Sequence, residues 1–228
     1  MLLKLLFLDL ETTGTDPVKN GIVQISGAVQ IREDMNIVRG ETFNFNLKPF
    51  PTDVIEDEAL EVTGLTRDDV LNNPERLDPM VAQKQFVKML CKYVDKFKKT
   101  DKFFIVGFAT TFDDNFLRAF FVKCNDKYYG SMICWPPIDL AVLAALNLGP
   151  RRMLMPNFKL ATTASAIGIP VDPGRLHDAS YDIDLTIALF DWCHGRIFFH
   201  PGLEAVDGGS TIVAPGRSEI AQRVVPQV

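Results

Sequence analysis

The chain has 228 residues, of which 47% are hydrophobic and 23% charged, and its formal net charge is −5. A length close to that of one domain and an ample apolar fraction exclude a disordered chain. The net charge excludes a broad attraction to nucleic acid, so binding of a polyanion would need a local basic patch or a bound metal. No apolar run reaches the roughly 18 residues of a membrane-spanning helix. Residues 1–8 are interpreted as a buried strand rather than a signal peptide, because Asp9 and Glu11 interrupt them at once.

The hydrophobic pattern predicts three strands followed by alternating helices and strands. Strands are expected at 2–10, 22–31 and 42–47 in antiparallel succession, then at 103–107 and at 132–135, where Pro136 and Pro137 stop the last one. Helices are expected from 52 or 53 to 60, from 66, and over 79–97, 113–122, 139–146, 159–167 and 179–195. This order predicts an α/β fold with a mixed sheet. Glycine and proline without periodicity after residue 200 predict a domain over 1–197 and an appendage over 198–228.

Two acidic residues stand at the end of the first predicted strand, in Phe7-Leu-Asp-Leu-Glu-Thr-Thr-Gly14. Residues two apart on a strand point to the same face, so Asp9 and Glu11 are expected to project together. Carboxylates this close repel each other and lose hydration, and a divalent cation relieves both costs. Oxygen ligands suit Mg²⁺ or Mn²⁺ rather than Zn²⁺. The alternative is a pair of solvated acids at a strand end, which are common on protein surfaces.

A third acid lies in Phe112-Asp-Asp-Asn-Phe-Leu117, after the fourth predicted strand. Every fourth residue from Phe112 to position 120 is a phenylalanine, which predicts a buried stripe along a helix. Asp113 falls in the first turn of that helix, where the helix dipole favours a carboxylate. Either Asp113 belongs to a functional site, or it or Asp114 only caps the helix.

The segment Leu176-His-Asp-Ala-Ser-Tyr-Asp182 holds the single His-x4-Asp pattern of the chain. His177 is expected in a loop before the last long helix, and Asp182 about one turn inside it. A loop histidine taken alone is usually a surface residue. All three acidic segments, however, lie at strand ends or helix starts, and such positions meet at one edge of an open α/β sheet. Their order therefore favours one shared acidic site.

With these motifs in this order, the sequence resembles the DEDDh (DnaQ-like) 3′→5′ exonucleases, a family that includes the epsilon proofreading subunit of bacterial DNA polymerase III. Asp9 and Glu11 match its first motif, Asp113 its second, and His177 with Asp182 its third. Further segments that look like those of the family are Ala59-Leu-Glu-Val-Thr-Gly-Leu-Thr66, Ile138-Asp-Leu140 and Lys159-Leu160. Three ordered motifs with correct internal spacing are a strong signal.

The sequence departs from the family pattern at two places. Members often carry a His-Asn pair shortly before the second-motif aspartate, where this chain has Phe108-Ala109. The loss of two polar groups there bears on substrate handling more than on metal binding. Gln24 stands where many relatives carry a glutamate on the second strand. None of the five catalytic-type residues is missing, so an active homologue is expected.

The resemblance implies a ribonuclease H-like fold, with a mixed five-stranded sheet flanked by helices, and two divalent metal ions, Mg²⁺ or Mn²⁺. Two such ions about 3.5–4 Å apart serve the attacking and the departing oxygen of phosphodiester hydrolysis. Asp9 would bridge them, Glu11 and Asp182 would complete the site on the nucleophile side, and Asp113 would support the second ion. His177 would be the general base, because an imidazole pKa of about 6.5 suits proton transfer near neutral pH.

The resemblance also implies a substrate, single-stranded nucleic acid with DNA favoured over RNA, and release of nucleoside 5′-monophosphates from its 3′ end. Contacts with the last nucleotide are expected from Leu10, Thr12, Leu60 and Thr63. Phe108 or Phe112 could stack on a base, although burial in the helix stripe is the alternative for Phe112. A polymerase or another replication protein is an expected partner, and a membrane is not.

Other functions and roles stay open. The chain could be an RNA-trimming or oligoribonuclease-type exonuclease, a non-catalytic recruitment module on the same fold, or an enzyme of small phosphoesters. The lysines at 84, 88, 92, 96, 98, 99 and 102 either guide a strand or partner, or form the solvated side of a helix. Four widely spaced cysteines indicate reduced thiols in a cytoplasmic protein.

Overall fold

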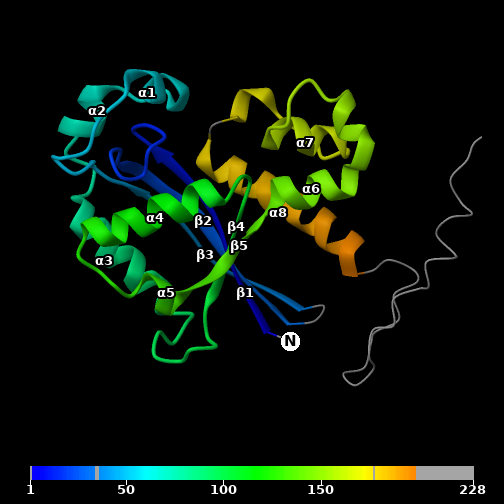
Figure 1. Ribbon diagram of the computed structural model, residues 1–228, viewed down its shortest axis with the longest axis horizontal. Helices are drawn as coiled ribbons and strands as arrows, with labels where there is room; N and C mark the ends of the chain where they lie inside the picture. The colour runs from blue at the N-terminus through cyan, green and yellow to red at the C-terminus, as the bar shows by residue number, and fades with distance from the viewer. Residues whose placement is uncertain (1, 34–35, 177, 199–228) are drawn as a thin grey trace, which may run out of the picture.

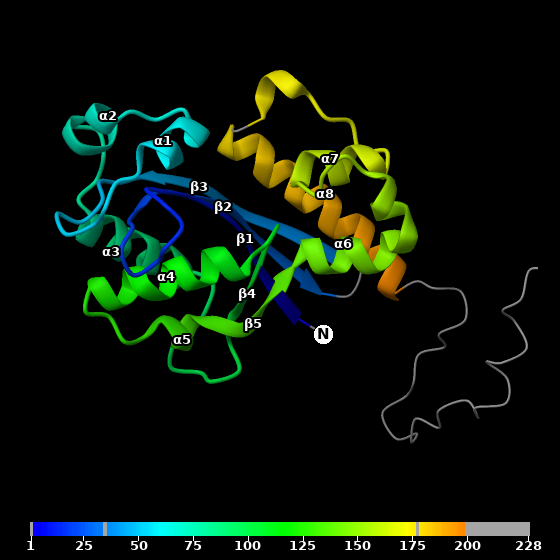
Figure 2. The ribbon, with the colours of Figure 1, turned by 45° about the horizontal axis from the view of Figure 1, so that its top comes forward.

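The computed structural model describes residues 2–33, 36–176 and 178–198, which form one sheet with helices on both faces (Figures 1 and 2). The strands are β1 (Leu2–Thr12), β2 (Ile22–Glu33), β3 (Asn36–Asn46), β4 (Phe103–Gly107) and β5 (Ile133–Asp139). The helices are α1 (Asp57–Thr63), α2 (Arg67–Asn72), α3 (Pro79–Leu90), α4 (Thr111–Lys123), α5 (Tyr129–Met132), α6 (Leu140–Leu148), α7 (Leu160–Ala166) and α8 (Ala179–Phe198), with 3₁₀ turns η1 (Gly149–Leu154) and η2 (Pro173–Arg175).

The sheet has the order β3-β2-β1-β4-β5. The pairs β1–β2 and β2–β3 are antiparallel, and the pairs β1–β4 and β4–β5 are parallel. The mixed five-stranded sheet predicted from the sequence is therefore confirmed. Because β1 and β4 run in the same direction, their carboxyl ends lie at one edge, where the segments that follow them meet.

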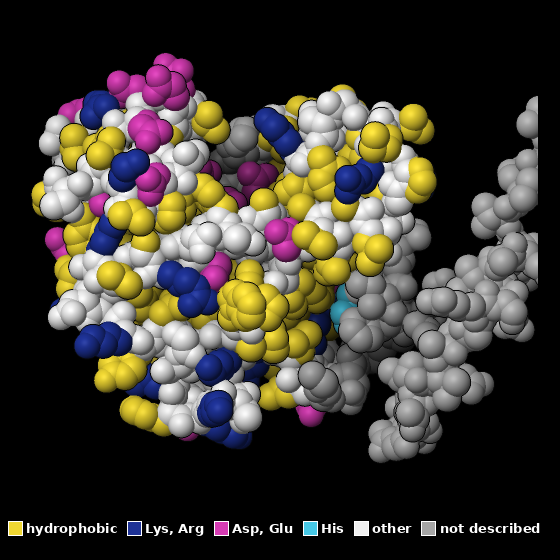
Figure 3. All heavy atoms as spheres, in the orientation of Figure 1, with side chains coloured by type: hydrophobic (Ala, Val, Ile, Leu, Met, Phe, Trp, Pro, Cys, Tyr) yellow, Lys and Arg dark blue, Asp and Glu magenta, His cyan; other side chains and the backbone are white. Residues whose placement is uncertain are grey.

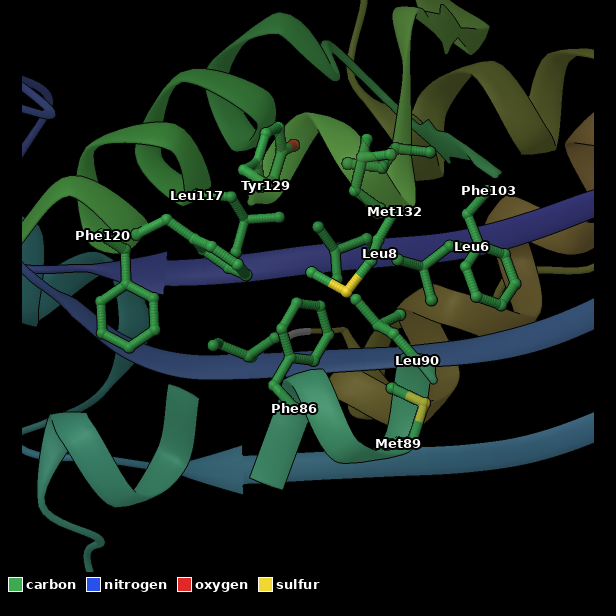
Figure 4. Close-up of a cluster of buried hydrophobic side chains, with 14 of the residues drawn as sticks. Leu6, Leu8, Phe86, Met89, Leu90, Phe103, Leu117, Phe120, Tyr129 and Met132 are labelled. Carbon is green, nitrogen blue, oxygen red and sulfur yellow. The ribbon is translucent and has the colours of Figure 1, made fainter. Parts of the chain in front are cut away.

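Alternate side chains of β1 enter two hydrophobic clusters on opposite faces of the sheet. Leu6 and Leu8 pack on one face with Phe86 of α3 and Leu117 of α4, as Figure 4 shows. Leu5 and Phe7 pack on the other face with α6 and α8. Both faces of β1 are covered, which explains why its sequence is continuously apolar.

Helix α3 ends earlier than the predicted 79–97. Asp78 caps its start by accepting hydrogen bonds from the backbone of Met80 and Val81, but the helix stops at Leu90. The chain then turns, and the Tyr93 hydroxyl accepts a hydrogen bond from the Glu41 backbone N–H on β3. Tertiary contacts of this segment with the sheet end the helix, so only the first two lysines of the predicted stripe, at 84 and 88, lie on it.

Strand β5 continues through the two prolines that were expected to stop it. The strand lies at the edge of the sheet, where a missing N–H costs no ladder hydrogen bond if it faces outward. The pairing with β4 is irregular between Phe104 and Val106 and resumes with Val106 opposite Ile138. The strand thus reaches Asp139 instead of residue 135.

Three smaller predictions are also corrected. Strand β3 begins at Asn36 rather than 42, and α5 was not predicted. Helix α1 begins at Asp57, because Asp53 is used elsewhere: it accepts hydrogen bonds from the Phe50 backbone N–H and the Lys123 ammonium. The predicted appendage lies outside the described residues apart from position 198. None of the helices that the structure describes is long and apolar enough to cross a membrane.

Candidate active site

Strand β1 places Asp9 and Glu11 on the face that packs against α8. They continue the alternation of Leu5 and Phe7, which are fully buried in that cluster. The apolar part of β1 therefore fixes the direction in which both carboxylates point.

Helix α8 brings Asp182 to the same pair. The ring of Phe190 contacts the ring of Phe7 edge to face, with centroids 5.5 Å apart, which anchors the helix on β1. Asp182 lies in the first turn of α8. Its charge raises the pKa of both Asp9 and Glu11. The structure thus brings together the first and third motifs, which are about 170 residues apart in the sequence.

Helix α4 supplies the fourth carboxylate. It follows β4 directly, and Gly107 lets β4 end close to β1, because a Cβ there would lie 2.9 Å from the Leu8 backbone oxygen. Asp113 is 5% exposed. Burial, followed by repulsion from Asp9, raises its pKa, and a hydrogen bond from the Leu10 backbone lowers it in part. The Asp113 carboxyl therefore lies beside the end of β1.

Asp114 has a different environment, although it is also buried. Its carboxylate accepts a hydrogen bond from the Tyr129 hydroxyl at 2.6 Å and forms an ion pair with Arg118 Nε at 2.7 Å. The Tyr129 contact holds α4 against α5, whereas Arg118 lies one turn further along α4 itself. Of the two adjacent acids that the sequence left as alternatives, Asp113 is the one coupled to Asp9.

The shared environment shifts the proton equilibria of these acids. Burial, followed by repulsion from Asp182, raises the pKa of Asp9 from 3.8 to about 6. Burial, then Asp9 and then Asp182, raise the pKa of Glu11 from 4.5 to about 7. Burial and then Asp9 raise the pKa of Asp113 well above its usual range. No lysine or arginine among the described residues offsets these shifts.

These carboxylates fit a hard divalent cation in the kind of donor they offer. Figure 3 shows acidic side chains at the bottom of a hollow between the α1–α2 region and the α7 region. Among the residues that the structure describes, no group of three His, Cys, Asp or Glu side chains is arranged to hold an ion. The carboxylates therefore share an electrostatic field, which acts over longer distances than ligand bonds, without closing on one point. A cation would offset both the burial and the repulsion.

His177 lies outside the described residues. The next residue, Asp178, accepts hydrogen bonds from the backbone of Ser180 and Tyr181 and so caps α8. This cap fixes where the helix begins and therefore where Asp182 lies on it. The expected role of His177 stays a prediction.

The residues expected to contact the last nucleotide lie close to β1 and α1, but their side chains are largely engaged. Leu10 is 6% exposed and Leu60 is 3% exposed, each within a hydrophobic cluster. The Thr12 hydroxyl donates to the Gly14 carbonyl at 2.7 Å, and the Thr63 hydroxyl to the Leu60 carbonyl at 3.0 Å. Contacts of these residues with substrate stay predictions.

The two candidate stacking residues differ in exposure. Phe112 is 37% exposed and contacts the ring of Phe116 at 4.7 Å, so its expected burial in the helix stripe is wrong. The stripe begins to be buried only at Phe116, because in the first turn of α4 the buried positions are those of Asp113 and Asp114. Phe108 is half-buried against Phe158, with centroids 5.8 Å apart.

Sequence reasoning missed Asp139 as a neighbour of the site. Its charge raises the pKa of Asp113, and it accepts hydrogen bonds from the backbone of Ala141 and Ala109. Its position at the end of β5 could have indicated it, but the prolines at 136 and 137 led to the prediction of a shorter strand. Ala109 itself adopts a φ of 62°, a left-handed conformation that asparagine tolerates better than alanine.

Comparison with known proteins agrees with this arrangement. A family model described as Exonuclease (RNase T) matches residues 6–190. Ribonuclease T of Marinobacter nauticus is 28% identical over 187 residues, which cover 80% of this chain and 78% of the relative. Ribonuclease T of Shewanella sp. strain MR-4 is 27% identical over 216 residues, covering 93% and 88%.

The fold is also that of a solved nuclease. The structure of E. coli exonuclease I in complex with a dT13 oligonucleotide superposes with a TM-score of 0.65 at 24% identity. The match covers 86% of this chain but only 43% of exonuclease I. This chain therefore corresponds to less than half of that protein.

Proposed function

Because this chain belongs to the RNase T exonuclease family of the DEDDh group, we propose that it is a metal-dependent 3′→5′ exonuclease. It hydrolyses phosphodiester bonds of single-stranded nucleic acid and releases nucleoside 5′-monophosphates. The observation that carries this function is the placement of carboxylates from β1, α4 and α8 at one edge of the sheet, with Asp113 buried and Asp9, Glu11 and Asp182 half-buried. Repulsion between neighbouring carboxylates destabilises the folded protein, and a bound cation would remove that repulsion, so such a group is a candidate for a functional site.

Four residues would hold the two divalent ions, Mg²⁺ or Mn²⁺. Asp9 is central, because it is coupled to both Asp182 and Asp113. Glu11 and Asp182 would complete the set on the α8 side, and Asp113 the set on the α4 side. When bound, such ions lower the pKa of water and stabilise charge on the leaving oxygen.

His177 is proposed as the general base that takes a proton from the attacking water. Its place in the sequence, directly before the cap of α8, puts it near Asp182 along the chain. We expect His177→Ala to slow nucleotide release by about 10²–10⁴-fold and to leave metal affinity nearly unchanged. Titration calorimetry with Mn²⁺ would separate this result from a structural defect.

DNA is proposed as the preferred substrate, and RNA is the competing candidate. The name ribonuclease T, which relatives of this chain carry, supports RNA, whereas exonuclease I was solved with a DNA oligonucleotide. A non-catalytic recruitment module is a further candidate, but such a function would not explain why several carboxylates lie together at this edge of the sheet.

A polymerase or another replication protein is a proposed partner. One solved complex of exonuclease I contains the C-terminal part of a protein named SSB, which makes a protein partner reasonable here.

A cytoplasmic site of action is proposed from the cysteines. All four are free thiols, and Cys124 and Cys193 are buried. Free thiols persist in reducing compartments.

The direct test is release of mononucleotides from matched DNA and RNA 12-mers labelled at the 3′ end, with Mg²⁺ or Mn²⁺. We expect loss of activity with EDTA and faster degradation of DNA. Faster degradation of RNA would instead support the RNA-trimming candidate. Absence of products from both substrates would contradict exonuclease function and leave the binding module.

A further inference from the structure

A row of polar side chains continues from the acid pair across the antiparallel part of the sheet. Asp9 lies opposite Ser26, and Ser26 lies opposite Asn44. Glu11 lies opposite Gln24 in the same way. Directly opposed residues of antiparallel strands share a face. The row therefore lies on the same face of the sheet as the carboxylates.

Hydrogen bonds within this row fix the orientation of Asn44. Its side-chain oxygen accepts hydrogen bonds from Gln24 Nε2 at 3.1 Å and from Ser26 Oγ at 3.3 Å. Gln24 Nε2 also donates to the side-chain oxygen of Asn46 at 3.0 Å. The Asn44 amide nitrogen makes no hydrogen bond to the described part of the chain, so it remains a donor for a ligand.

Asn44 faces a recess of about 300 Å³ between the sheet and the first turns of α8. Figures 1 and 2 both show the start of α8 beside the end of the sheet that β2 and β3 form. The recess is lined by Ser26, Thr42, Asn44, Ser180, Ile183 and Asp184, among others. Asp184 is exposed and has no ion pair or hydrogen bond to the described residues. The volume of the recess lies at the lower end of the range for ligand pockets.

The charges around this recess decide what it can bind. Asp184 and the nearby Asp9 and Asp182 repel a phosphate. The Asn44 amide nitrogen needs an acceptor, and the Asp184 carboxylate accepts from a donor. A suitable ligand group is therefore uncharged and both donates and accepts hydrogen bonds. A ribose 2′-hydroxyl and the edge of a nucleobase have this chemistry.

We propose that this recess is a subsite for the sugar or base of the nucleotide next to the cleaved bond. This inference rests on the proposed function, because the cleaved phosphodiester is taken to lie at the carboxylates. Neighbouring strands are about 4.8 Å apart, so Asn44, two strands from Asp9, lies about 10 Å away. One nucleotide spans that distance. Ile183 also lines the recess, but it is 4% exposed, so its apolar contribution to binding is small.

The test is the affinity of four 12-mers labelled at the 5′ end, dA12, rA12, dU12 and rU12, measured by fluorescence anisotropy in EDTA. The variants are Asn44→Ala and Asn44→Asp, which both remove the donor, and Asn36→Ala is the control at the far end of β3. We expect the wild type to discriminate among the four, and both Asn44 variants to reduce that discrimination three- to tenfold. Asn36→Ala should behave as the wild type.

The pattern identifies the bound group. Loss of the ribose-to-deoxyribose ratio for both bases assigns the 2′-hydroxyl, and loss of the adenine preference for both sugars assigns a base edge. If the discrimination of both Asn44 variants stays within twofold of the wild-type value, the subsite proposal is overturned. Because binding in EDTA needs no turnover, a wild type that discriminates but releases no nucleotide would overturn the exonuclease function alone.

Discussion

At the edge of the sheet where β1 ends, the half-buried Asp9 and Glu11 lie with the buried Asp113, and each has a raised pKa. At the edge where β1 begins, Asp101 accepts hydrogen bonds from the Asp95 backbone N–H and the Lys4 ammonium, and its pKa is lowered. The same residue type is thus destabilising at one edge and stabilising at the other. The difference is that the residues the structure describes supply a positive partner for Asp101 but none for Asp9, Glu11 and Asp113. Carboxylates without such a partner are expected to be stabilised by a bound cation.

The largest effect is expected from Asp9→Asn, which removes the central carboxylate at the edge of the sheet where β1 ends. We expect nucleotide release to fall by about a thousandfold or more, because Asp9 would contact both ions. Binding of Mn²⁺, measured by calorimetry, should be lost as well. A variant that keeps more than a tenth of the activity would contradict the central place of Asp9.

A pair of matched variants separates the adjacent acids of α4. Asp113→Asn should lower the rate of nucleotide release by about a hundredfold or more and change stability little. Asp114→Asn should keep most of the activity and destabilise the fold by about 1–3 kcal/mol, because it weakens the contacts with Arg118 and Tyr129. Denaturant unfolding and the exonuclease assay together decide the assignment. The opposite pattern would make Asp114 the site residue.

The pH dependence of stability sharpens the comparison between the edges. In the folded protein the pKa of Asp9 is raised from 3.8 to about 6, and the pKa of Glu11 from 4.5 to about 7. The folded state therefore holds these protons more tightly than the unfolded state. The resulting stabilisation is complete below about pH 4 and is lost as the pH rises through 6 to 7. For Asp9 this amounts to roughly 2–3 kcal/mol.

The measurement is urea unfolding in EDTA at a series of pH values, with Asp9→Asn as the matched variant. The wild type should lose stability relative to the variant between pH 4 and 8, and Mg²⁺ should restore it at pH 8. A difference between the two proteins that does not depend on pH would contradict the raised pKa of Asp9.

The smallest effect is expected at the opposite edge. Asp101→Asn removes the charge that pairs with Lys4, and we expect a loss of about 0.5–1 kcal/mol, because the pair is partly exposed. Exonuclease activity should stay within twofold of the wild type. A large loss of activity would show that the two edges are coupled.

Much of the candidate site could be predicted because its chemistry is local in the sequence. The alternation of a strand places Asp9 and Glu11 on one face whatever the strand pairs with. The first turn of a helix likewise fixes the approximate place of Asp113 and of Asp182. The order of these motifs was enough to predict the sheet edge at which they meet.

Features that depend on pairing or packing could not be predicted. The sequence favours Asp113 over Asp114 only through the motif that it matches, and the contacts of Asp114 with Tyr129 and Arg118 show what the second acid does instead. The end of α3 depends on a hydrogen bond between Tyr93 and β3.

The sequence by itself determined the family, the sheet and the identity of the acids, because these follow from periodicity and motif order. Only the tertiary structure decided which residues lie beside them. The register of β1, β2 and β3 places Gln24 directly opposite Glu11 and places Asn44 on the same face, two strands from Asp9, and a shift of one residue would turn them to the other face. Register is a property of the folded sheet, since no single strand contains it.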